Sequence, residues 1–183
     1  MIVVIILIVV VVLLAVFVIS IYNKMVRFRN RIENAWAQID VQLKRRWDLI
    51  PNLVETVKGY ASHERETLEA VIAARNSATT AQGPAAQAQS ENMLTGALRQ
   101  LFAVSEAYPE LKANDNFRDL QEELTATEGR IAYARQLYND TVLKYNNSIQ
   151  TFPGVVMAGP MGFTAREYFE ADDEARGNVS VEF

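Results

Sequence analysis

The sequence predicts an all-α membrane protein: a single N-terminal transmembrane helix followed by an elongated antiparallel four-helix bundle with a C-terminal tail packed on it. An uninterrupted apolar run opens the chain, and apolar residues beyond it recur at spacings of three and four. Segments rich in glycine and proline separate these periodic stretches. The expected organisation is a transmembrane anchor over 1–22, an α-helical bundle over 23–152, and a C-terminal tail with a short helix over 153–183.

The anchor is the run IVVIILIVVVVLLAVFVISI, from Ile2 to Ile21, which holds no charge, proline or glycine. A helix of about 20 residues rises roughly 30 Å, the thickness of the hydrocarbon core of a bilayer. The many β-branched residues do not oppose a helix there, because in lipid the backbone must satisfy its own hydrogen bonds. The alternative is a cleaved signal peptide, but the basic start, shorter apolar run and small-residue cleavage site of such a segment are not visible.

Four basic residues follow the apolar run: Lys24, Arg27, Arg29 and Arg31. No basic residue precedes the run, so the positive-inside rule places the N-terminus outside and the bundle in the cytoplasm. The same four residues are candidate lipid-headgroup contacts, because basic side chains near the surface attract anionic lipids. In the alternative interpretation they only fix the orientation.

The first helix of the bundle should be long. Its apolar stripe is marked by Ile32, Ala35, Ile39, Gln42 and Arg46, and continues with Ile50, Leu53, Val54, Val57 and Tyr60. Pro51 lacks an N–H, which predicts a bend, or a helix restarted from an Asp48 cap. Gly59 to Ser62 indicates a break with Ser62 as the next N-cap, although the two helices could also be continuous.

The cluster Lys44-Arg45-Arg46 beside Trp47 raises the question of nucleic-acid binding. The net charge of −4 argues against it, because such binding needs a broad basic patch. We expect two solvated charges and one whose stem lies along the edge of the core. Trp36 is three helical turns from Trp47 and should pack on the same face, in or beside the bundle.

Three more helical segments follow. The alanine-rich ETLEAVIAARNSA precedes a loop, SATTAQGPAAQAQ, and a third helix that ends near Tyr108-Pro109 or at ELKAND. The fourth segment carries a coiled-coil-like seam that needs partner helices. The seam comprises Phe117, Leu120, Leu124, Thr127, Ile131, Ala134, Tyr138, Thr141 and Tyr145.

The tail begins with TFPGVVMAGPMGF, which is rich in glycine and proline but also apolar. A free linker would be more polar, so this segment should pack on the bundle. Thr164 to Glu167 matches a capping box and predicts a short helix through Phe169. The acidic end of the chain, ADDEARGNVSVEF, is expected to be less ordered, with Val179, Val181 and Phe183 able to add a short extended contact.

No catalytic constellation is visible. The chain has one histidine, His63, expected in an exposed first turn, and it has no cysteine. It lacks HExxH, phosphate-loop, GxGxxG and GxSxG patterns. Carboxylates such as Glu122-Glu123 have no histidine nearby and should be solvated. We therefore predict no enzyme activity, no catalytic residue, no cofactor and no metal.

Three stretches strongly resemble the LemA family of bacterial membrane proteins, and the resemblance covers nearly the whole chain after the anchor. They are YNKMVRFRNRIENAWAQIDVQLKRRWDLIPNLVETVKGYASHERETLEAVIAAR, ARQLYNDTVLKYNNSIQTFPG and REYFEADDEAR. The resemblance implies a membrane helix, a long helical bundle and a short segment outside the cell, but no agreed reaction. One branch of the family is associated with building membrane-bounded organelles in magnetic bacteria, which favours scaffolding at a membrane.

The sequence thus predicts a non-enzymatic scaffold or adaptor, anchored by a single pass in the bacterial inner membrane. Its expected partners are the lipid bilayer and unidentified proteins, with other copies of the chain as candidates, and not nucleic acid. One alternative is a peripheral lipid-binding or membrane-organising protein acting through the basic segment 24–46. Another is a regulator of a separate membrane enzyme.

Overall fold

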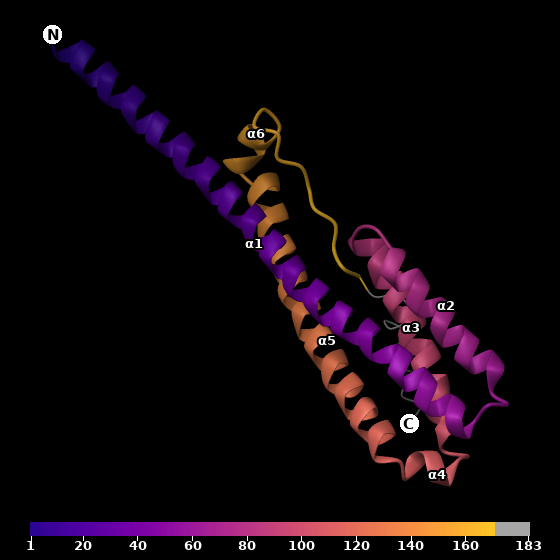
Figure 1. Cartoon of the computed structure of the whole chain (residues 1–183). Helices are drawn as coiled ribbons and strands as arrows, with labels where there is room; N and C mark the ends of the chain where they lie inside the picture. The colour runs from indigo at the N-terminus through magenta and orange to yellow at the C-terminus, as the bar shows by residue number, and fades with distance from the viewer. Residues whose placement is uncertain (171–183) are drawn as a thin grey trace, which may run out of the picture. The chain divides into compact units, whose positions relative to one another are not determined.

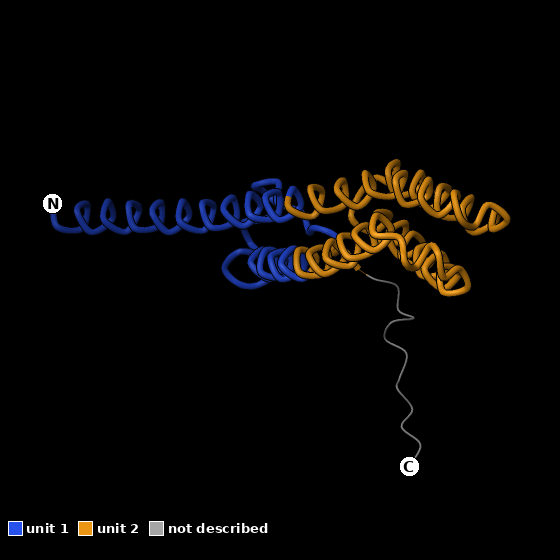
Figure 2. Tube along the Cα trace, turned by 60° about the horizontal axis from the view of Figure 1, so that its bottom comes forward, with its two compact units in different colours: residues 1–37, 136–167 blue, residues 38–135, 168–183 orange. Residues whose placement is uncertain are grey.

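The structure, a computed structural model, describes residues 1–170, and every regular element in that range is an α-helix. The helices are α1 (Ile2–Tyr60), α2 (Arg65–Thr80), α3 (Pro84–Ser105), α4 (Pro109–Lys112), α5 (Asp115–Gln150) and α6 (Gly154–Ala158) (Figure 1). The chain divides into two compact units (Figure 2). Of the described residues, unit 1 comprises 1–37 and 136–167, and unit 2 comprises 38–135 and 168–170. The acidic end predicted to be less ordered lies outside the described residues.

Unit 1 contains the apolar run and the part of the chain that packs directly after it. Side chains of the run are exposed at nearly every position, and α1 is the one described helix long and apolar enough to cross a membrane. Beyond the run, Met25, Ile32 and Ala35 of α1 are buried. Trp36 meets Tyr138 of α5 edge to face, with ring centroids 5.5 Å apart. The prediction that Trp36 packs among the helices is confirmed.

Unit 2 is organised around one hydrophobic core to which all of its helices contribute. Trp47 and Leu49 pack against this core from α1. The buried core residues are Ile50, Leu53, Val54, Val57, Ala61, Leu68, Val71, Ala78, Leu94, Ala97, Leu98, Leu101, Leu111, Phe117 and Leu124. Burial of a large aliphatic side chain contributes about 1.5–3 kcal/mol, so this cluster is the main source of the unit's stability.

The helical stripes predicted from the sequence are mostly buried; on α1, Gln42 is half-buried and Tyr60 is exposed, which corrects the prediction at that end of the stripe. On α5, seven of the nine predicted seam residues are buried, and Leu120 and Thr141 are half-buried. The loop around Gly83-Pro84 is confirmed but shorter than predicted, because α2 continues to Thr80 and α3 begins at Pro84. Gly83 has φ +86°, a backbone conformation that favours glycine, and Pro84 suits the first turn of a helix.

The break after Gly59 is real, but its predicted N-cap is wrong. Helix α1 ends at Tyr60 and α2 begins at Arg65, so the two helices are separate and Glu64 is the N-cap residue. The turn is fixed by Ala61, which is buried in the core and accepts a hydrogen bond from the Glu64 amide at 3.1 Å. Ser62 is therefore held within the turn and cannot cap α2.

Helix α1 continues through Pro51, and no second helix restarts at Asp48. A proline removes the hydrogen bond to the carbonyl four residues earlier, here that of Trp47. Arg75 of α2 supplies the missing donor, since its Nε–H donates to the Trp47 carbonyl at 2.8 Å. A tertiary contact thus replaces the helical bond that the proline removes.

The helix predicted over Thr164–Phe169 is wrong: these residues have no regular secondary structure. Side chains of α5 satisfy the backbone of this segment instead. Asn146 donates to the Arg166 carbonyl and accepts from the Arg166 amide, both at 2.9 Å. Tyr145 donates to the Thr164 carbonyl at 2.9 Å, and Tyr138 to the Glu167 carbonyl at 3.0 Å. These tertiary bonds outweigh the local capping signal, and the tail does pack on α5.

Candidate functional site

The predicted basic site lies on α1, directly after the apolar run. Lys24, Arg27 and Arg31 are exposed, and their spacing of three and four places them on one side of the helix. The Arg27 Nε–H donates to the Asn23 carbonyl at 3.2 Å, while the Arg31 guanidinium lies 5.8 Å from the centre of the Phe28 ring. The three cations remain accessible from solvent, and their contact with headgroups stays a prediction.

Arg29 is separated from the other three. It is half-buried, and its guanidinium lies 5.9 Å from the centre of the Phe163 ring. Phe163 is itself buried and meets Tyr22 edge to face, with centroids 5.6 Å apart. The structure therefore gives Arg29 a contact that attaches the tail to α1, whereas the side chains of the other three basic residues remain exposed.

A second group of charged residues, not predicted from the sequence, is buried inside unit 2. Arg46 and Glu91 are 3% and 1% exposed, and Arg46 Nη1 lies 3.1 Å from Glu91 Oε2. Trp47 Nε1 donates to Glu91 Oε1 at 2.8 Å, and Gln87 Nε2 donates to the same oxygen at 3.3 Å. Arg46 Nη2 also donates to Thr95 Oγ1 at 2.8 Å. We call Arg46, Trp47, Gln87, Glu91 and Thr95 the buried polar cluster.

Burial dominates the electrostatics of this cluster. It raises the pKa of Glu91 above its ordinary value of 4.5, and the charge of Arg46 with the Trp47 and Gln87 hydrogen bonds opposes that rise. Burial likewise lowers the pKa of Arg135 on α5; the negative charge of Glu91 opposes this shift, and the positive charge of Arg46 adds to it. The Arg135 guanidinium lies 4.7 Å from the centre of the Phe169 ring. Two guanidinium groups thus interact with one buried carboxylate.

The buried polar cluster has the geometry of a structural hydrogen-bond network. Its carboxylate accepts three hydrogen bonds, which hold both of its oxygens. A general base needs an oxygen that a substrate can reach, and a buried, fully engaged carboxylate offers none. The arrangement therefore fixes how α1 meets α3 within unit 2.

Of the Lys44-Arg45-Arg46 prediction, the two solvated charges are confirmed, but the position of the third side chain needs correction. Lys44 and Arg45 are exposed, and Arg45 pairs with Glu123 at 2.6 Å. The Arg46 stem was expected at the core edge, but its guanidinium is buried as well. The sequence contained a signal for this burial: Gln87 and Glu91 fall in the same register as Leu94, Leu98 and Leu101 of α3.

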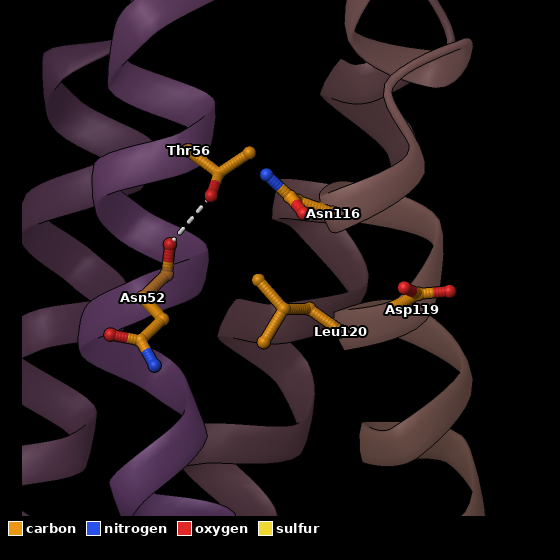
Figure 3. Close-up of a pocket in the computed structure, with 5 residues that line it drawn as sticks. All are labelled: Asn52, Thr56, Asn116, Asp119 and Leu120. Atoms are coloured by element: carbon orange, nitrogen blue, oxygen red, sulfur yellow. Dashed lines mark hydrogen bonds between the residues drawn. The ribbon is translucent and has the colours of Figure 1, made fainter.

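An open pocket of about 400 Å³ lies between α1 and α5 in unit 2 (Figure 3). Its lining residues are Asn52, Thr56, Asn116, Asp119 and Leu120. The Thr56 hydroxyl donates to the Asn52 carbonyl at 2.8 Å, and Asp119 is the one ionisable residue of the lining. A lone carboxylate without an acid or base partner does not form a catalytic pair.

The remaining candidates for catalysis or metal binding are the single histidine and groups of acidic side chains. His63 is exposed in the turn between α1 and α2, as expected. Within residues 1–170, no group of three or more His, Cys, Asp or Glu side chains could hold a metal ion.

The all-helical fold and the exposed apolar run of α1 indicate a class: a membrane-associated helical protein. The chain belongs to the LemA family, whose sequence profile matches residues 35–183. It is 26% identical over 163 residues to protein LemA of Metamycoplasma hominis, covering 87% of this chain and 73% of that protein.

Two further relatives are named as magnetosome proteins. The chain is 26% identical over 175 residues to magnetosome protein MamQ 2 of Paramagnetospirillum magneticum, covering 81% of this chain and 64% of that protein. It is also 26% identical over 174 residues to magnetosome protein MamQ of Magnetospirillum gryphiswaldense, with the same coverage of 81% and 64%. The chain therefore spans less than two thirds of the length of these MamQ relatives.

Proposed function

We propose that this protein is a single-pass scaffold or adaptor of the bacterial inner membrane, with a four-helix bundle over 23–152 that presents a binding surface to protein partners. The observation that carries the proposal is the exposed apolar run of α1 in a chain whose remainder buries its own core. In this proposal the N-terminus is outside and the bundle is cytoplasmic. The partners include other copies of the chain.

Free energies support the anchoring step. Removing one large aliphatic side chain from water is worth about 1.5–3 kcal/mol, so a run of this length gains tens of kcal/mol in lipid. That gain exceeds the whole stability of a typical domain, about 5–15 kcal/mol. Within unit 1, α1 leaves the apolar run without a non-helical linker and packs against α5 through Trp36.

Three observations support a scaffold rather than an enzyme. The buried carboxylate is fully engaged, the pocket between α1 and α5 has one ionisable lining residue, and the described residues hold no candidate metal cluster. The MamQ relatives are named magnetosome proteins, which agrees with a role in organising a membrane compartment.

Site-specific photocrosslinking in cells tests the proposal. A photoreactive residue at Val41 or Tyr133, both exposed and apolar, should give discrete crosslinked products in the membrane fraction. The same residue at buried Leu101 should give none. Discrete products that contain a second copy or a structural protein support the scaffold, and a product with a membrane enzyme favours the regulator. A complete lack of products from every exposed position contradicts both roles.

A second candidate function, organising anionic lipids, is favoured by the shared exposed side of Lys24, Arg27 and Arg31. At about 1 kcal/mol per basic residue near the surface, the three would contribute roughly 3 kcal/mol. In reconstituted vesicles, energy transfer to labelled anionic lipid should fall when all three become glutamine. Changing exposed Lys44 and Arg45 to glutamine is the matched control. Equal transfer in both variants would exclude this function.

A further inference from the structure

Helix α6 exposes an apolar surface to solvent. Phe152, Val155 and Val156 are 82%, 51% and 66% exposed. Val155 and Val156 lie in the first turn of α6, and Phe152 lies in the turn directly before it. Isolated exposed apolar residues are ordinary, whereas several exposed within five residues of chain are typical of an interaction surface. We call these three residues the α6 surface.

The α6 surface lies beside the part of α1 that follows the apolar run, within unit 1 (Figure 1). A Cβ added to Gly154 would lie 1.9 Å from the Ser148 carbonyl oxygen and 2.9 Å from Met25 Cε. The backbone of α6 is therefore pressed against both α5 and α1, and only glycine allows that approach. Phe163, which follows α6, contacts Tyr22 and so holds the other end of the same loop.

This contact places α6 at the end of the apolar run. Met25 follows Ile21 by four residues, which is about 6 Å along a helix axis at about 1.5 Å per residue. Amphipathic elements at a membrane surface bury their apolar side chains roughly 5–10 Å into the boundary between headgroups and acyl chains. A bilayer that accommodates the run of α1 would therefore have its headgroup layer at the level of α6.

We propose that the α6 surface inserts into the headgroup–acyl boundary of the bilayer that holds α1, as a second membrane contact. This inference rests on the proposed anchoring by α1. Lipid, rather than a protein, should cover the α6 surface, because this surface lies next to the point where the apolar run of α1 leaves the bilayer. Exposed Lys24 and Arg27 lie on the adjoining turns of α1 and complement anionic headgroups.

Depth-dependent fluorescence quenching tests the proposal on the full chain. The sequence has no cysteine, so Val156→Cys gives one labelling site for an environment-sensitive dye. Phe152→Cys is a second site on the α6 surface, in case one variant fails to fold. Leu14→Cys reports on the anchor, and Tyr133→Cys, whose parent side chain is 71% exposed, is the matched control outside α6. Each variant is reconstituted into phosphatidylcholine vesicles with a minor fraction of phosphatidylglycerol, and circular dichroism verifies its helicity.

The expected result is a graded pattern of quenching. The labels at 156 and 152 should show blue-shifted emission and be quenched severalfold more by a nitroxide near the headgroup than the label at 133. The label at 14 should be quenched most by a nitroxide in the middle of the acyl chain. If the label at 14 responds and those at 156 and 152 match the label at 133, the inference is wrong while the anchor stands.

Two other outcomes would also overturn the inference. No quenching at 14 would remove the anchor itself, and with it the proposed function. Energy transfer between labels at 156 on different copies, without quenching by lipid, would show that a second copy covers the α6 surface.

Discussion

Removing the carboxylate of the buried polar cluster should strongly destabilise the protein. In Glu91→Ala, the Arg46 guanidinium loses its countercharge and the Trp47 N–H loses its acceptor, while both remain inside unit 2. Breaking a buried ion pair by removing one partner costs about 3–5 kcal/mol. For a protein of this size each kcal/mol lowers Tm by about 2–4 °C, so Tm should fall by roughly 6–20 °C.

The assay is thermal unfolding of the full chain in detergent micelles, followed by far-ultraviolet circular dichroism. Lys44→Ala is the matched control, because Lys44 is a charged residue of the same helix but is exposed. Its Tm should stay within the small range of surface substitutions, about 0.5 kcal/mol or less in stability. If Glu91→Ala lowers Tm no more than Lys44→Ala does, the inference that Arg46 and Trp47 depend on the Glu91 carboxylate as a buried partner is refuted.

Replacing both partners separates the cost of a stranded charge from the worth of the pair. Arg46→Met with Glu91→Leu removes both charges and keeps apolar volume, and such replacements are often neutral or stabilising by about 1–4 kcal/mol. The double variant should therefore be more stable than Glu91→Ala. A double variant as unstable as the single one would show that packing and the unsatisfied Trp47 N–H, rather than the unpaired charge, decide the loss.

The pH dependence of Arg46→Met follows from the pKa of Glu91. That pKa is raised in the folded protein by burial, so ionisation of Glu91 favours unfolding. The favourable contribution is complete below the ordinary value of 4.5 and is lost as pH rises through the folded pKa. Removing Arg46 raises the folded pKa further, so the loss should extend to higher pH than in the parent chain. Melting curves across mildly acidic to mildly alkaline buffers check this shift.

Two further predictions concern contacts that replace regular helical bonds. Arg75→Ala should cost about 1–3 kcal/mol because it leaves the Trp47 carbonyl unsatisfied, and the cost should shrink in a Pro51→Ala background, where a new N–H at position 51 supplies the bond. Equal costs in both backgrounds, measured by urea unfolding, would contradict this account. Asn146→Leu should release the tail, so the Arg166 amide should exchange with deuterium faster, whereas substitution of exposed Asn147 should leave that rate unchanged.

Burial patterns could be predicted from the sequence because they depend on periodic apolar residues. The seam from Phe117 to Tyr145 was predicted from spacing alone, and a helix that must bury one stripe has few other solutions. Arg46 was even placed in the stripe of the first helix. Its full burial was not predicted because the partner, Glu91, lies 45 residues away in the sequence. Apolar periodicity does not show which charged residues on different helices will pair.

Local signals failed where tertiary contacts override them. Thr164 to Glu167 carries a capping box, yet hydrogen bonds from Tyr138, Tyr145 and Asn146 hold the segment in a conformation without regular secondary structure. Pro51 predicted an interruption that Arg75 compensates from another helix. Neither compensation has a signature within a short window of sequence, because each depends on which side chains the fold brings opposite.

The membrane-proximal surface was predicted in part. Four basic residues were proposed as one group, and helical geometry already separates Arg29 from Lys24, Arg27 and Arg31. The contact that Arg29 makes with Phe163 depends on where the tail packs, which no local pattern encodes. The same is true of the α6 surface, since its position beside Met25 follows from the close approach at Gly154.

The central claim is that lipid holds the apolar run while the rest of the chain folds around its own core. Membrane flotation of the full chain and of a chain without residues 2–21 tests it most directly, with circular dichroism on both. The full chain should float with vesicles after alkaline carbonate washing, and the shortened chain should lose this resistance but stay helical and melt cooperatively. A shortened chain that is largely non-helical, or a full chain that carbonate removes from the vesicles, would contradict it.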